Sequence, residues 1–116
     1  MSRPWPILWH PAYRSELRCL SHHAREARQI RAATLKLESA GPALGFPHSS
    51  AVRGSRSGLR ELRPLAGRSP WRVLYARRGD ALILLALAPE AMHDPRGFRA
   101  AVARAESRLI GLDRDR

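Results

Sequence analysis

Cysteine, lysine and long apolar runs are almost missing from this sequence, and each shortage narrows what the protein can be. One cysteine, Cys19, stands among 116 residues, which excludes an intramolecular disulfide framework and fits a reducing compartment. The longest apolar run, residues 81–89, is too short to cross a bilayer, and residues 1–13 lack the apolar stretch of a secretory signal. The sequence therefore predicts a cytoplasmic protein with no membrane partner.

Acidic residues are also scarce. Asp and Glu number 10 against 21 Lys and Arg, all but one of the basic residues are arginine, and the formal net charge is +11. A charge of this size predicts a polyanionic partner, either nucleic acid or an acidic protein, and binding that weakens as salt is added.

Signatures of a metal or a cofactor are missing too. His22 lies four residues before Glu26, a spacing that metal ligands use, but a zinc site needs three or four ligands and no companion is evident. Residues 54–58 read GSRSG, a basic turn without the helix and the Lys-Ser/Thr pair of a Walker phosphate loop. We therefore expect no metal and no cofactor.

The residues that are present show the pattern of one small α+β domain. A chain of this length buries about two thirds of its unfolded surface, and we expect a single domain over residues 1–116 with an N-terminal arm at 1–10 and a polar tail at 113–116. The pattern predicts a strand, a helical hairpin packed on a small, mainly antiparallel sheet, and a C-terminal helix. The predicted ranges are a strand at 6–10, helices within 11–39 broken at 20–23, strands at 51–53, 59–65, 70–77 and 81–88, and a helix from 95.

Helix ends and faces can be read from single residues. Gly41 and Pro42 should stop the hairpin, and Asp94 followed by Pro95 should start the last helix. The strand at 81–88 is apolar on both faces, which predicts a central, covered strand. The apolar stripes are Ala24, Ala27, Ile30, Thr34 and Leu37 in the hairpin, and Phe98, Ala101, Val102, Ala105, Leu109 and Leu112 in the last helix.

Arginine is concentrated between residues 53 and 78, where eight arginines accompany a single acid, Glu61. A tight turn at 66–69 would place Arg63 directly opposite Arg72 in a β-hairpin. Two like charges in this position destabilise a hairpin by about 0.2–1 kcal/mol, which suggests that an anion binds between them. Alternation predicts one face with Glu61, Arg63, Arg72 and Leu74, and a core face with Leu62, Trp71, Val73 and Tyr75.

These residues fit the chemistry of RNA cleavage without a metal. That reaction needs a base for the 2′-hydroxyl proton, cations for the phosphorane and an acid for the leaving 5′-oxygen. Arg63 and Arg72 suit the cationic role, because a guanidinium binds phosphate with two parallel hydrogen bonds. His48 and His93 are candidates for proton transfer, with Glu61 as a further candidate base. The other candidate nucleic-acid contacts are Arg53, Arg56, Arg60, Arg68, Arg77 and Arg78.

Each candidate also has a purely structural interpretation. Arg63 and Arg72 could be solvated on the open face of a sheet. Glu61 could form a salt bridge to one or both of them. Either histidine could be a surface residue without a function.

Several short motifs follow one another as they do in the RelE/HigB superfamily of toxin-antitoxin toxins. Residues 41–47 read GPALGFP, 52–56 read VRGSR, 58–64 read GLRELRP, 67–69 read GRS and 71–75 read WRVLY. The chain most resembles the HigB-like, phage-derived branch, in which a Gly-Leu-x-Glu-Leu-Arg strand precedes an Arg-Val-Leu-Tyr strand. The resemblance extends over about residues 24–112.

The resemblance implies a function as well as a fold. It implies a RelE-like microbial RNase fold, cleavage of free or ribosome-bound mRNA, a cognate antitoxin of the helix-turn-helix type, and catalytic roles for Arg63 and Arg72. One stretch departs from the family, since many members carry lysines after the last strand and residues 86–95 contain none. Three functions stay open: a toxin endoribonuclease, a catalytically inactive relative that binds nucleic acid or a partner through its basic face, and a ParE-like inhibitor of DNA gyrase.

Overall fold

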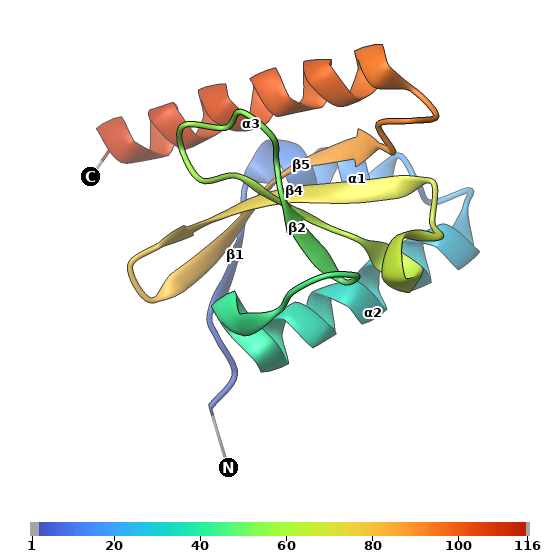
Figure 1. Ribbon diagram of the computed structural model, residues 1–116, viewed down its shortest axis with the longest axis horizontal. Coiled ribbons are helices and arrows are strands. Elements are labelled where there is room, and N and C mark those ends of the chain that lie inside the picture. The colour runs from blue at the N-terminus through green and yellow to red at the C-terminus, as the bar shows by residue number, and fades with distance from the viewer. Residues whose placement is uncertain (1–2, 116) are drawn as a thin grey trace.

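The fold is a mixed β-sheet with helices on both faces. A computed structural model describes residues 3–115, and within them the chain forms one five-stranded sheet and three α-helices (Figure 1). The strands are β1 (Ile7–Trp9), β2 (Ser49–Ala51), β3 (Arg60–Leu62), β4 (Trp71–Arg78) and β5 (Ala81–Pro89). The helices are α1 (Pro11–Arg18), α2 (Ala24–Ala40) and α3 (Pro95–Arg114), with 3-10 turns η1 (Gly41–Ala43) and η2 (Pro64–Gly67).

The order of the strands in the sheet is β1-β5-β4-β3-β2. β1 is parallel to β5, and the other neighbouring pairs are antiparallel. The predicted α+β class, with a helical hairpin, a mainly antiparallel sheet and a C-terminal helix, is therefore confirmed. Within the described residues, no helix is both long and apolar enough to cross a membrane.

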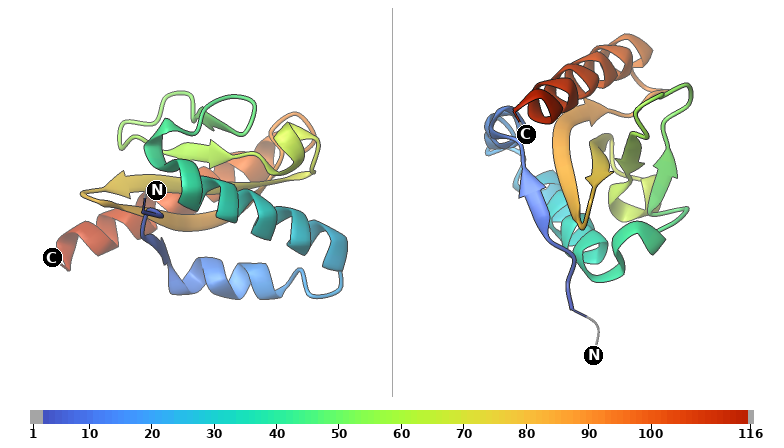
Figure 2. Two further views of the ribbon diagram at one scale, coloured as in Figure 1. Left: turned by 90° about the horizontal axis from the view of Figure 1, so that it is seen from below. Right: turned by 90° about the vertical axis from the view of Figure 1, so that its left-hand side faces the viewer.

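Two hydrophobic clusters fill the space on either side of the sheet. α2 covers one face, α3 covers the other, and α1 packs beside α2 along the edge of β5 (Figure 2). β5 contributes to both clusters, with Leu82 and Leu84 on the α2 side and Ile83 and Leu85 on the α3 side. The central position predicted for this strand is confirmed, because β5 lies between β1 and β4.

Capping side chains set the helix ends that the sequence predicts. The Nδ1 atom of His10 accepts a hydrogen bond from the Ala12 N–H (3.0 Å) at the start of α1. Asp94 accepts one from the Gly97 N–H (2.9 Å) at the start of α3. The helical hairpin breaks at residues 19–23, one residue earlier than the predicted 20–23.

The apolar stripes are confirmed except at one position. Ala101, Ala105 and Leu109 of α3 are buried against the sheet. Ala24, the first residue of the stripe predicted in α2, is exposed, because the first turn of the helix extends past the edge of the core. Ala33, which was not in the predicted stripe and directly precedes Thr34, is buried.

The strand expected at residues 51–53 begins earlier. It lies at Ser49–Ala51, because these residues pair with β3, and Gly54, at φ +77°, turns the chain away afterwards. A positive φ of this kind is readily adopted by glycine. The start of β2 is therefore directly beside the end of β3.

The hairpin has the predicted register but a different turn. Leu62 pairs with Val73, which is the pairing that places Arg63 opposite Arg72. β3 nevertheless stops at Leu62, because Pro64 has no N–H to donate to a ladder. The η2 turn that Pro64 begins takes the place of the tight turn expected at 66–69.

An ion pair closes the edge of β5 that β1 leaves open. β1 pairs with β5 at residues 82–84, and further along β5 the edge is covered by α1. Glu16 of α1 accepts hydrogen bonds from the Leu87 N–H (3.0 Å) and from Arg108 of α3 (2.8 Å). Arg108 also donates to the carbonyl of Leu85 (2.7 Å). The pair therefore satisfies two backbone groups and joins α1 to α3.

We expect Glu16→Gln to lower the free energy of unfolding by about 1.5–3 kcal/mol at neutral pH and by less in acid. Burial raises the pKa of Glu16, but hydrogen bonds from Arg108 and Leu87, with the charges of Arg108 and Arg104, outweigh burial and lower it. The stabilisation is therefore complete above the unfolded pKa of about 4.3 and is lost as pH falls through the folded pKa. Urea unfolding of both proteins across this pH range measures the difference.

Glu26→Gln is the matched control, because it removes the same charge from a half-buried carboxylate on α2 whose ion pair is with the exposed His23. A loss of stability of the same size and pH dependence in both variants would contradict an edge-closing role for Glu16.

Candidate functional site

Residues from neighbouring strands meet at the end of the sheet where β2 and β4 begin. The N–H of Arg63 donates to the carbonyl of His48 (2.8 Å), and the β3–β4 register places Arg63 opposite Arg72. Arg72 in turn pairs with Ala88 of β5. These four residues form a row across the sheet, with neighbouring strands about 4.8 Å apart.

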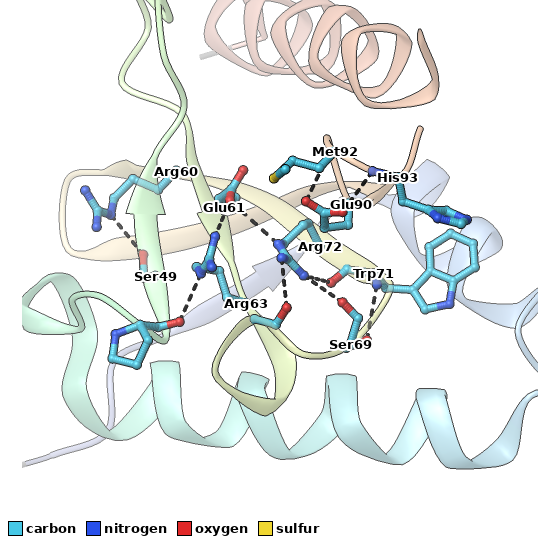
Figure 3. Close-up of polar contacts among 12 residues, drawn as sticks. Ser49, Arg60, Glu61, Arg63, Ser69, Trp71, Arg72, Glu90, Met92 and His93 are labelled. Atoms are coloured by element: carbon cyan, nitrogen blue, oxygen red, sulfur yellow. Dashed lines mark hydrogen bonds and ion pairs between the residues drawn. The ribbon is translucent and has the colours of Figure 1, made fainter. Parts of the chain in front are cut away.

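Arg72 is buried, and its guanidinium donates three hydrogen bonds to backbone carbonyls. The residue is 3% exposed. Its Nη1 atom donates to the carbonyls of Ser69 and Trp71 (2.9 Å each), and its Nη2 atom donates to the carbonyl of Gly67 (3.1 Å) (Figure 3). Its Nε atom lies 3.6 Å from Oε1 of Glu61. Arg72 therefore holds the segment between η2 and β4 and leaves no surface for a ligand to contact.

Arg63 is the more accessible of the two facing arginines, with a side chain that is 20% exposed. Its Nε atom donates to the carbonyl of Pro47 (3.0 Å), and its Nη1 atom donates to Oε1 of Glu61 (2.9 Å). Its guanidinium carbon lies 5.1 Å from the centre of the Phe46 ring. The Nη2 atom makes no hydrogen bond within residues 3–115, so Arg63 keeps a donor for an anion.

Glu61 supplies the anion between the two arginines. One of its oxygens, Oε1, contacts both guanidinium groups (Figure 3). Glu61 therefore forms a salt bridge to both arginines, which is the structural role considered for it from the sequence. Two cations share one carboxylate, which leaves the group with an excess of positive charge. Burial, followed by the charge of Arg63, lowers the pKa of Arg72, while Glu61 and Glu90 raise it.

Glu90 and His93 lie beyond Arg72, in the segment that leads into α3. The N–H groups of Met92 and His93 both donate to the carboxylate of Glu90 (2.9 Å each). The Met92 hydrogen bond is the largest influence that lowers the pKa of Glu90, and the charge of Arg72 acts in the same direction. The imidazole of His93 points away from Arg72 (Figure 3).

His48 lies on the other side of Arg63. His48 and Arg63 line a small cavity of about 110 Å³ between α2 and η2, together with Gln29 and Lys36. No sequence motif indicated Gln29 and Lys36, which share one face of α2 at helical spacing. Lys36 is the single lysine of the chain. This rarity was the one feature of the sequence that could have marked it as a candidate site residue. Among the residues that the structure describes, none that lines this cavity is acidic.

Two of the six remaining arginines lie near the central pair. Arg60 donates from Nε to the hydroxyl of Ser49 (3.0 Å), which is also bonded to the hydroxyl of Tyr75. Arg68 is exposed, in the segment that Arg72 holds, and donates to the carbonyl of Leu65 (3.1 Å). The structure therefore brings Arg60 and Arg68 close to the row.

The other four lie elsewhere. Arg53 and Arg56 are exposed in the loop after β2. Arg77 stacks over Trp5 (5.0 Å), and Arg78 forms an ion pair with Asp113 (3.2 Å). The last two are at the far end of β4, about 20 Å along the strand from Arg72. The predicted basic surface is therefore divided into three parts: the row, the loop after β2 and the far end of β4.

A separate apolar cavity of about 460 Å³ opens on the opposite side of α2, between α1, α2 and β1. Its wall includes Ile7, Trp9, Leu17, Ile30 and Leu35. Within residues 3–115 no three His, Cys, Asp or Glu side chains are grouped so that they could hold a metal ion.

Comparison with known families gives one match. Residues 15–88, which run from α1 to the end of β5, match the model of the family described as phage derived protein Gp49-like (DUF891). The matched part covers well over half of the chain and includes Glu61, Arg63 and Arg72, whereas His93 and α3 lie outside it. No curated protein and no solved structure matches the chain.

Proposed function

The chain belongs to the Gp49-like family of phage-derived proteins, a RelE/HigB-like toxin group, and on this basis we propose that it is a toxin that cleaves mRNA without a metal and is inhibited by a cognate antitoxin. The observation that carries the proposal is the state of Arg63. This cation is fixed by Pro47 and Glu61, keeps a free donor, and lies beside His48 at the rim of the sheet.

The residues divide into two roles. Arg63 donates to the phosphate that is cleaved, and its charge stabilises the phosphorane. Arg72 and Glu61 are positioning residues, because Arg72 holds Glu61 and Glu61 orients Arg63. Arg60 and Arg68 contact neighbouring phosphates, with Arg53 and Arg56 further along the strand of RNA.

Proton transfer is assigned first to His48. It takes the proton of the 2′-hydroxyl, the 2′-oxygen attacks phosphorus, and the bond from phosphorus to the 5′-oxygen breaks. The 5′-oxygen takes a proton from water as it leaves, which gives a 2′,3′-cyclic phosphate and a free 5′-hydroxyl. His93, in the segment between β5 and α3, is the second candidate and reaches the phosphate only if its side chain turns toward Arg72. Glu61 is the alternative base.

The antitoxin is proposed to bring acidic side chains to the exposed arginines or to lock the helical hairpin. Two features support this proposal: Arg56 is exposed and Arg63 is partly exposed, and the apolar cavity between α1, α2 and β1 is open to a partner. Association through the arginines should be fast and sensitive to salt, because exposed charges are screened over about 8 Å at physiological ionic strength.

Expression of the chain alone should arrest bacterial growth, and Arg63→Gln should relieve the arrest without unfolding the protein. Loss of one transition-state donor commonly lowers turnover by about 10²–10³-fold. Cleavage of free mRNA in the presence of EDTA, and of ribosome-bound mRNA in a buffer with the magnesium that ribosomes need, measures this effect. His48→Gln and His93→Gln, compared in the same assay, identify the imidazole that transfers the proton.

Arg25→Gln is the matched control, because Arg25 is an exposed arginine of α2 away from the row. It should leave both the arrest and the cleavage unchanged. A folded wild-type protein that neither arrests growth nor cleaves RNA would contradict the proposal and favour an inactive nucleic-acid-binding relative. Arrest with intact mRNA and inhibited DNA gyrase would favour the ParE-like function.

A further inference from the structure

Phe46 is unusual among the aromatic residues of this protein. Its side chain is 75% exposed, whereas the other aromatic side chains within residues 3–115 are buried or half-buried. A single exposed apolar residue is common on protein surfaces. Trp5 and Trp9 also have an arginine over the ring, but Phe46 combines such a contact, with the guanidinium of Arg63 at 5.1 Å, with an exposed side chain.

The Phe46 ring is held next to the cation that faces the substrate. Arg63 is itself fixed by the carbonyl of Pro47, the residue after Phe46, and by Glu61. Arg63 covers one face of the ring, and the exposure of the side chain leaves the other face open to solvent. The ring and the guanidinium are close enough for a single nucleotide to contact both.

We propose that Phe46 is a stacking platform for a nucleobase of single-stranded RNA whose phosphate is bound by Arg63. The inference rests on the proposed function and deepens it by naming how the substrate is recognised. Flat aromatic side chains beside cations bind unpaired bases in this way, and such stacking tolerates different bases because every base has a π-face. In a duplex the base faces are covered by their neighbours, so the site selects single strands.

The test measures binding of a short fluorescent RNA that carries 2′-O-methyl groups and therefore cannot be cleaved by attack of its 2′-hydroxyls. Phe46→Ala should weaken binding about 5- to 150-fold, Phe46→Leu should weaken it similarly, and Phe46→Trp should retain it. An oligonucleotide with abasic sites has no base to stack on Phe46. It should bind the wild type weakly, and it should bind Phe46→Ala with the same affinity as the wild type. Leu8→Ala, an exposed apolar residue on β1, is the control and should change nothing.

The salt dependence of binding distinguishes the phosphate contact of Arg63 from the stacking contact of Phe46. Arg63→Gln should reduce the dependence of Kd on salt, because it removes a phosphate contact, whereas Phe46→Ala should leave this dependence unchanged.

Unchanged affinity in Phe46→Ala and Phe46→Leu, with affinity still lost in Arg63→Gln, would overturn the stacking site and leave the proposed function standing. Unchanged RNA affinity with a weaker antitoxin complex would show that Phe46 is a protein contact and would overturn it too. A wild-type protein that does not bind single-stranded RNA would overturn both the site and the proposed function.

Discussion

Arg72→Met should lower the free energy of unfolding by about 3–5 kcal/mol, the range seen when one member of a buried charge pair is removed. The guanidinium satisfies the carbonyls of Gly67, Ser69 and Trp71 and lies against Glu61. Methionine fills a similar volume but leaves these groups without a donor. For a domain whose total stability is about 5–15 kcal/mol, this is a large fraction. Urea unfolding measures it.

Arg68→Met is the matched control for Arg72→Met. Arg68 lies in the same segment but is exposed, so its loss should change stability by no more than about 0.5 kcal/mol. Equal losses in the two variants would contradict a structural role for Arg72. The prediction also affects the toxicity assay, because Arg72→Met would relieve growth arrest through unfolding, and Arg63→Gln is therefore the variant that tests catalysis.

Gly41→Ala should be the second strongly destabilising substitution. Gly41 has φ +62° and ψ −145° at the end of α2, a conformation that costs other residues about 1–3 kcal/mol. An added Cβ would also lie 2.3 Å from the ring of Trp5, so the indole would have to move from its place against the core. Thermal unfolding and tryptophan fluorescence measure the two effects.

Gly79→Ala is the control for Gly41→Ala, because it introduces backbone strain at a positive φ without a clash against another side chain. Gly79 has φ +60°, but no atom lies within 4 Å of the position of its Cβ. This variant should therefore lose stability through strain alone and should leave the fluorescence of Trp5 unchanged. If Gly41→Ala lost no more stability than Gly79→Ala, the contact with Trp5 would not contribute to the fold.

The sequence alone determined the elements and the pairing within the hairpin. Helix ends depend on residues a few positions away, so Gly41, Asp94 and the break at 19–23 could be placed from local patterns. Alternation and the distance between the strands predicted that Arg63 faces Arg72, although the turn between them has a different form. The family resemblance was also visible in short motifs, and the match to residues 15–88 supports a toxin.

Only the tertiary structure decided how deep each side chain lies and what it contacts. A period of two assigns a residue to a face of the sheet and does not tell whether that face is open, so Arg63 and Arg72 looked equivalent. Arg72 is buried because the segment after η2 folds back over it, and its partners are backbone carbonyls that no side-chain pattern reveals.

Contacts between distant elements were likewise decided by packing. Glu16 meets Arg108 from the opposite end of the chain, and Lys36 reaches the cavity beside Arg63 only because α2 packs against η2. The eight arginines form one cluster in sequence, but the length of β4 carries Arg77 and Arg78 away from the rest. Local sequence sets the direction of each side chain, whereas burial and neighbours depend on which elements the folded chain brings together.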